Sequence, residues 1–108
     1  VEIPFVLKCL LLVTCHMIGD FVFQGDWIAA GKGKSWEILT YHVLIYTAVF
    51  VPLAFLVPEM SLATVLIIFG THFLIDPCKA RWKILKTIWQ DQLCHFTVLG
   101  GLLAVGWL

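Results

Sequence analysis

Side chains with metal-binding chemistry recur at a fixed spacing in this sequence. Three histidines have an aspartate four residues away and a fourth stands alone: His16/Asp20, His72/Asp76, Asp91/His95 and His42. Residues four apart project from one face of an α-helix, so each pair can direct an imidazole and a carboxylate toward one centre. Each histidine falls in a different apolar stretch, where a polar group without a partner is costly. The pattern therefore predicts one polar site built from several apolar helices.

Imidazole and carboxylate together favour a divalent cation such as Zn, Mn or Fe. Carboxylates gathered at membrane depth repel one another, and a divalent cation removes that cost. The predicted ligands are His16, Asp20, His42, His72, Asp76, Asp91 and His95. They exceed the needs of one tetrahedral site, so the surplus would serve a second metal or Asp–His hydrogen bonds that orient the ligands. A metal-free proton relay through the same pairs is the alternative.

Four further polar residues are expected to hydrogen-bond to these ligands: Gln24, Tyr46, Lys79 and Gln92. Gln24 continues the helical face of the first pair, and Tyr46 lies one turn from its nearest histidine. Lys79, together with Arg81, could instead hold an anionic headgroup or anchor the chain at a membrane surface.

The segments that must position these residues are long and apolar. Of 108 residues, 61% are hydrophobic and 13% are charged, whereas soluble domains are nearer half apolar and a quarter charged. A transmembrane helix needs about 20 mostly apolar residues. Four stretches qualify, at about 4–24, 36–57, 59–76 and 88–108. We therefore expect an all-α fold, with one integral membrane domain over residues 1–108 that forms a four-transmembrane-helix antiparallel bundle.

A short amphipathic interfacial helix is expected at about 79–90, before the last span. Its basic residues and its tryptophans occupy different helical faces: Lys79, Lys83 and Lys86 against Trp82 and Trp89. This pattern is typical of a helix that lies in the membrane interface with Trp at headgroup depth. Pro77 predicts that the third span ends or kinks at Asp76, because proline disfavours helical geometry in the preceding residue.

Positive charge predicts the orientation. Six basic residues fall in the connections after the first and third spans: Lys32, Lys34, Lys79, Arg81, Lys83 and Lys86. Only Lys8 lies at the other end, so the positive-inside rule places these connections in the cytoplasm and both termini outside. The first connection, with Asp26, Lys32 and Lys34, is interpreted as a solvated loop. The His/Asp pairs lie toward the same span ends, slightly below the predicted cytoplasmic interface.

The ordered motifs resemble a known family. They are HxxGDFxxQ from His16 to Gln24, His42 with Tyr46, HxxxDxxK from His72 to Lys79, and DQxxH from Asp91 to His95. This order is similar to that of small bacterial and phage membrane proteins catalogued as domain of unknown function 3307. The resemblance spans nearly the whole chain and implies one polar unit built from all four spans, in a multi-pass protein of the bacterial inner membrane. It implies no particular activity.

The first functional hypothesis is a metal-dependent hydrolase that acts on a lipid or phosphoester-type substrate at the cytoplasmic leaflet. Metal would activate water, while Asp91 or His42 would move its proton. A non-enzymatic metal-binding or scaffolding subunit of a larger membrane assembly is the second hypothesis, and a proton or ion relay is the third. The expected partners are the lipid bilayer and other membrane subunits or copies of the chain. The net charge is zero, so a nucleic-acid partner is not expected.

Overall fold

The computed structural model describes residues 3–108, and this part of the chain is helical with no β-strand. Its elements are α1 (Phe5–Met17), the π-helical turn η1 (Ile18–Val22), α2 (Asp26–Gly31), α3 (Trp36–Ala54), α4 (Leu62–Ala80) and α5 (Ile88–Ala104). The all-α prediction is therefore confirmed. The molecule is elongated, with extents of 43 × 22 × 22 Å.

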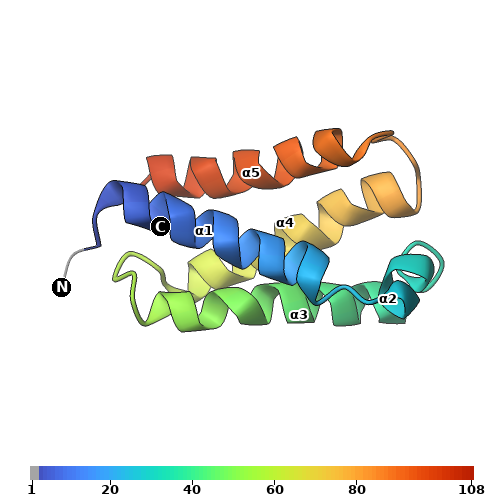
Figure 1. The fold of residues 1–108 in the computed structure, drawn as a ribbon, viewed down its shortest axis with the longest axis horizontal. Coiled ribbons are helices and arrows are strands. Elements are labelled where there is room, and N and C mark those ends of the chain that lie inside the picture. The colour runs from blue at the N-terminus through green and yellow to red at the C-terminus, as the bar shows by residue number, and fades with distance from the viewer. Residues whose placement is uncertain (1–2) are drawn as a thin grey trace.

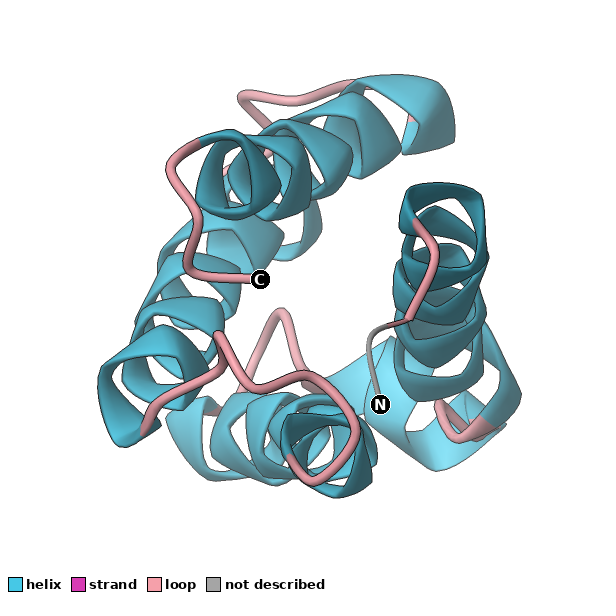
Figure 2. Cartoon of the chain, turned by 90° about the vertical axis from the view of Figure 1, so that its left-hand side faces the viewer, coloured by secondary structure: helices cyan, strands magenta, loops and turns pink. Residues whose placement is uncertain are grey.

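The long helices α1, α3, α4 and α5 run back and forth along the longest axis (Figure 1). The short helix α2 and the connection between α4 and α5 lie at one end, and both termini lie toward the other, which faces the viewer in Figure 2. The half nearer the termini holds the apolar core: Leu12, Tyr46, Phe50, Leu53, Val57, Met60, Ile68, Leu99, Leu102 and Leu108. The buried histidines and aspartates lie in the half nearer α2.

Three helical segments are long and apolar enough to cross a membrane: Phe5–Val22, Trp36–Ala54 and Leu62–Ala80. The fourth predicted span corresponds to α5, which has only 17 residues. Large apolar side chains face outward along these helices, including Phe5, Leu10, Leu44, Leu66 and Leu93. An apolar exterior of this kind suits lipid better than water.

Side-chain caps set where the later helices begin. The hydroxyl of Ser35 accepts a hydrogen bond from the backbone N–H of Ile38 at the start of α3. Ser61 forms a capping box with Thr64 at the start of α4, and Thr87 forms one with Gln90 at the start of α5. Each box satisfies donors that a helix start leaves free. The third span consequently starts at Leu62, later than predicted.

The predicted interfacial helix at about 79–90 is wrong. Lys79 and Ala80 form the last turn of α4, and an irregular loop then runs to the Thr87 cap of α5. The backbone N–H groups of Ile84 and Leu85 fold back onto the carbonyl of Cys78, and Lys83 adopts a φ of 56°. These bonds cap the end of α4, so the backbone cannot also form a continuous helix.

Two further local predictions are corrected. Of the two alternatives predicted from Pro77, an end or a kink at Asp76, the end is excluded, because α4 continues through Pro77 to Ala80. Proline removes one backbone donor, but the last turn is closed by hydrogen bonds from the backbone N–H groups of Arg81 and Trp82 to the carbonyl of the buried Pro77. The connection after the first span is also not simply a loop, since Asp26–Gly31 forms α2.

Candidate metal centre

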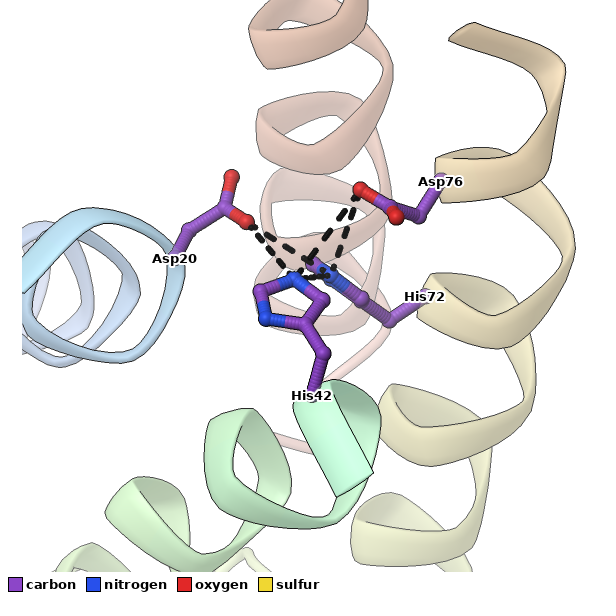
Figure 3. A group of neighbouring side chains, drawn as sticks. All are labelled: Asp20, His42, His72 and Asp76. Carbon is purple, nitrogen blue, oxygen red and sulfur yellow. Dashed lines mark hydrogen bonds and ion pairs between the residues drawn. The ribbon is translucent and has the colours of Figure 1, made fainter. Parts of the chain in front are cut away.

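Four buried side chains from three helical segments meet at one point. Asp20 comes from η1, His42 from α3, and His72 and Asp76 from α4 (Figure 3). The Nε2 atoms of His42 and His72 lie 3.1 Å apart, and Asp20 Oδ1 lies 3.2 Å from the first and 3.6 Å from the second. Asp76 Oδ1 completes the group at 3.9 and 4.0 Å from the two imidazole nitrogens. All four side chains are at most 4% exposed.

These separations match the needs of a metal site. Ligand atoms bound tetrahedrally at about 2.1 Å from a metal lie about 3.4 Å from one another. The five separations above range from 3.1 to 4.0 Å. Two imidazole nitrogens that face each other beside two carboxylate oxygens are the donor set that Zn, Mn or Fe prefers. The four residues therefore fit a divalent cation without rearrangement of the helices.

A second group adjoins the first through a shared carboxylate. Asp20, Asp91 and His95 also bring one ligand atom each within 4.8 Å of the others. His95 Nε2 lies 3.4 Å from Asp91 Oδ1, and both residues come from α5. Because Asp20 belongs to both groups, the predicted ligands converge from all four long segments of the chain.

The π-helical turn explains how Asp20 reaches both groups. A π-turn inserts an extra residue into the helix and redirects the side chains that follow, and such turns are frequent at functional sites. Gly19 lets this turn pack directly on α3: a Cβ there would lie 2.9 Å from Tyr46 Cδ1 and 3.1 Å from Tyr46 Cα. The glycine therefore sets the depth at which Asp20 enters the site.

His16 lies outside both groups, although it was predicted as a ligand. Its Nδ1 hydrogen-bonds with the Tyr46 hydroxyl at 2.8 Å, and its Nε2 hydrogen-bonds with Gln92 Oε1. The Gln92 amide accepts at that oxygen, so Nε2 donates and the tyrosine hydroxyl donates to Nδ1. Gln92 Nε2 in turn donates to Asp20 Oδ2 at 2.9 Å. His16 thus orients Gln92, and Gln92 holds Asp20.

The other predicted supporting residues take different positions. Tyr46 stacks on the His72 ring, with centroids 3.9 Å apart, in addition to its bond with His16. Gln24 and Lys79 line a cavity of about 110 Å³ that also touches Asp20 and Asp91. The two are therefore placed at the entrance of the site and make no hydrogen bond to its ligands among residues 3–108.

Lys32 is the main functional candidate that the sequence reasoning missed. Its Nζ donates to Asp76 Oδ1 at 2.9 Å, and its side chain is 14% exposed. From the sequence it is instead predicted to belong to a solvated loop with Asp26 and Lys34. The sequence does contain a signal for this role. Buried carboxylates require a compensating cation, and Lys32 lies in the connection at the same end of the predicted bundle as the aspartates.

Two features of the site show that its polar groups are incompletely satisfied. Three carboxylates are buried, those of Asp20, Asp76 and Asp91. Among the residues described, Lys32 supplies the one ammonium group that pairs with any of them. With neutral histidines, two negative charges remain, which is the charge that one divalent cation balances. Two buried atoms here, His72 Nδ1 and Asp76 Oδ2, also lack a hydrogen-bond partner within residues 3–108, and Asp91 Oδ1 and His95 Nε2 lie 3.4 Å apart without hydrogen-bond geometry. Such atoms are costly unless a ligand satisfies them.

Comparison with known proteins identifies a family and nothing more specific. No curated protein and no solved structure matched the chain. A family model with the description "Protein of unknown function (DUF3307)" matched residues 7–105. Because this match covers nearly the whole chain, the protein belongs to that family.

Proposed function

We propose that this protein is a multi-pass membrane protein whose His/Asp cluster binds a divalent cation and hydrolyses a lipid or phosphoester-type substrate. The observation that carries the proposal is the convergence of Asp20, His42, His72 and Asp76, with ligand-atom separations of 3.1 to 4.0 Å in a site that retains uncompensated negative charge. A structural hydrogen-bond network would instead leave its charges balanced.

The apolar segments support insertion into the bacterial inner membrane. Three of them are long enough to span it, and α5 is proposed as the fourth. Its 17 residues rise by about 25 Å, and a bilayer accommodates a span a few ångströms short by local thinning. The remaining apolar exterior would contact lipid, other membrane subunits or further copies of the chain.

Charge distribution supports the proposed orientation. The basic connections lie at the end that carries α2 (Figure 1). The His/Asp cluster lies in the parts of the long helices that adjoin these connections. At the other end Lys8 pairs with Glu59 at 3.5 Å, which reduces its weight as a topological signal. The positive-inside rule then places the cluster near the cytoplasmic leaflet, with both termini outside.

The chain's residues can perform hydrolysis in named roles. Asp20, His42, His72 and Asp76 would hold the cation, which supplies Lewis-acid activation of water near neutral pH. Asp91 lies at the wall of the 110 Å³ cavity beside the ligands, and its Oδ1 makes no hydrogen bond within the described chain and lies 3.4 Å from His95 Nε2. It can accept the proton of water as the water oxygen bonds to the electrophilic centre. It then returns that proton to the leaving oxygen as the scissile bond breaks.

Metal analysis of the purified protein tests the proposal. We expect stoichiometric Zn, Mn or Fe in the wild type and loss of that metal in Asp76→Asn, because the variant removes a charged ligand without changing its shape. Asp26→Asn is the matched control, since Asp26 is exposed on α2 and outside the cluster. Asp91→Asn should keep the metal and lose hydrolysis. A wild-type protein that carries no metal would refute the proposal, and metal without hydrolysis in the wild type would indicate the non-enzymatic subunit instead.

A further inference from the structure

We propose that the substrate of this site is a lipid with a phosphate headgroup, held across three connected cavities; the proposal rests on the hydrolytic function above. The phosphate would enter a basic cavity at the α2 end, the scissile bond would lie beside the His/Asp cluster, and the hydrocarbon chain would occupy a groove between η1 and α5. Each cavity supplies one part of the argument.

The basic cavity is defined by five cationic side chains and has a volume of about 430 Å³. They are Lys32, Lys34, Lys79, Arg81 and Lys83, and no carboxylate lines the same cavity. Lys32 is partly neutralised by Asp76, but the other four have no ion-pair partner among residues 3–108. An unbalanced cluster of this kind attracts an anion, and a guanidinium beside lysines is suited to phosphate oxygens.

Arg81 supplies an independent sign of a ligand. Its Nη1 is buried and has no hydrogen-bond partner within the described chain. Its guanidinium carbon lies 4.2 Å from the centre of the Trp36 ring, which fixes the group over that ring. A buried charged donor without an acceptor is costly, and a phosphate oxygen in the cavity would satisfy it.

The walls of the basic cavity are also held together. A Cβ on Gly33 would lie 2.2 Å from the carbonyl oxygen of Ala80. The loop that carries Lys32 and Lys34 is therefore packed directly on the end of α4, next to Arg81. The cationic groups of both segments face one cavity without any rearrangement of the backbone.

The basic cavity continues into the cleft beside the metal ligands. The 110 Å³ cleft touches Asp20 and Asp91, and it shares Gln24, Lys32 and Lys79 with the basic cavity. A phosphate bound by the lysines would thus have a bond to its substituent within reach of the His/Asp cluster. Free phosphate would fill only the basic cavity and the cleft.

The cleft also opens on an apolar groove, which is why the occupant is a lipid. The groove has a volume of about 710 Å³ and shares Phe21, Ile88 and Gln92 with the cleft. Its other walls are apolar and include Trp89, Leu93 and Phe96. A hydrocarbon chain attached to the phosphate fits this sequence of a charged cavity, a polar cleft and an apolar groove.

Native mass spectrometry of the purified, metal-loaded Asp91→Asn variant in a nonionic detergent tests the proposal, because this variant is expected to keep the metal and to leave a phosphoester probe intact. Hexadecyl phosphate is the probe, hexadecanol the neutral probe of equal chain length, and inorganic phosphate the competitor. We expect one hexadecyl phosphate per chain, bound at least about tenfold more tightly than hexadecanol, as charge-assisted hydrogen bonds to the headgroup require. Inorganic phosphate should displace it only at far higher concentration, because it lacks the hydrocarbon chain.

Matched variants separate the two parts of the site. Arg81→Gln and Lys79→Gln should each weaken hexadecyl phosphate binding about tenfold, whereas Lys86→Gln, which removes a charge outside the basic cavity, should not. Leu93→Trp should obstruct the groove and weaken binding, whereas Leu66→Trp, at an equally exposed position on α4, should not. Retained metal in these variants shows that the chain is folded.

The outcomes distinguish this proposal from the proposed function. Equal affinity for the phosphate and the alcohol, in protein that carries metal, would overturn the lipid phosphate site and leave the metal centre intact. Effective displacement by inorganic phosphate at the probe's own concentration would identify free phosphate as the occupant and would also overturn it. Tight, variant-sensitive binding by protein that never acquires metal would support the lipid site and refute the hydrolase.

Discussion

Replacement of Lys32 by methionine is the most informative perturbation of the cluster. Its ammonium lies 2.9 Å from Asp76 Oδ1, with side-chain exposures of 14% and 2%. Removal of one partner from a buried ion pair costs about 3–5 kcal/mol. Because the lysine is partly exposed, we take the lower end, about 3 kcal/mol. This cost falls on the metal-free protein, in which no other lysine or arginine within residues 3–108 pairs with Asp76.

The same variant should bind metal more tightly. A bound divalent cation compensates Asp76 by itself, so the metal-loaded protein should lose little when the ammonium is removed. By linkage, a loss of about 3 kcal/mol in the metal-free state alone tightens metal binding by about 100-fold. Methionine keeps the length of the side chain, so packing is largely preserved.

Two measurements check this expectation. Competition with a chromophoric chelator in detergent gives the metal affinity, and thermal unfolding followed by circular dichroism gives the stability with and without metal. Lys34→Met is the control, because Lys34 is exposed in the same loop and has no ion pair within residues 3–108. Weaker metal binding by Lys32→Met, or equal destabilisation of both states, would refute the reasoning, since the lysine would then support the metal-bound state.

Two other predictions concern how the ligands are positioned. Gly19→Ala should destabilise the protein by about 1–3 kcal/mol through overpacking, because the new Cβ would lie 2.9 Å from Tyr46 Cδ1, and it should also weaken metal binding. Gly70→Ala is the control, since a Cβ there would meet open space. It should be neutral or stabilising when thermal unfolding is measured in the same way. Tyr46→Phe should lower the free energy of unfolding by about 1 kcal/mol, because His16 Nδ1 loses its donor. An unchanged unfolding curve for Tyr46→Phe would show that the His16 bond does not contribute.

The sequence was sufficient for the four long helices and for the helical faces that carry the His/Asp pairs. Apolar stretches of bilayer length predicted the helices, and i,i+4 spacing placed His72 with Asp76 and Asp91 with His95 on single helical faces. Both signals are local, because helical periodicity depends only on near neighbours along the chain. The motif order likewise identified the family, which the match over residues 7–105 confirms.

Side-chain periodicity failed where backbone hydrogen bonds and caps decided the structure. The amphipathic pattern at about 79–90 predicted a helix, but backbone bonds to Cys78 and the Thr87 cap divide that segment between two helices and a loop. The periodicity of apolar and charged side chains carries no information about which backbone N–H group bonds to which carbonyl. Pro77 likewise does not end α4, whose last turn is closed by backbone hydrogen bonds from Arg81 and Trp82 to the Pro77 carbonyl.

Only the tertiary structure decided which polar atoms face one another. Helical periodicity predicts both His16 and His72 as ligands. In the structure, however, both ring nitrogens of His16 form hydrogen bonds, one with Tyr46 and one with Gln92. It is the π-turn on Gly19 that lets Asp20 serve both groups, and the packing of α2 that brings Lys32 to Asp76. The physical reason is that a hydrogen bond or ion pair forms only when two atoms from distant segments are placed to within a few tenths of an ångström. Helical periodicity in the sequence shows only which face of each segment is polar.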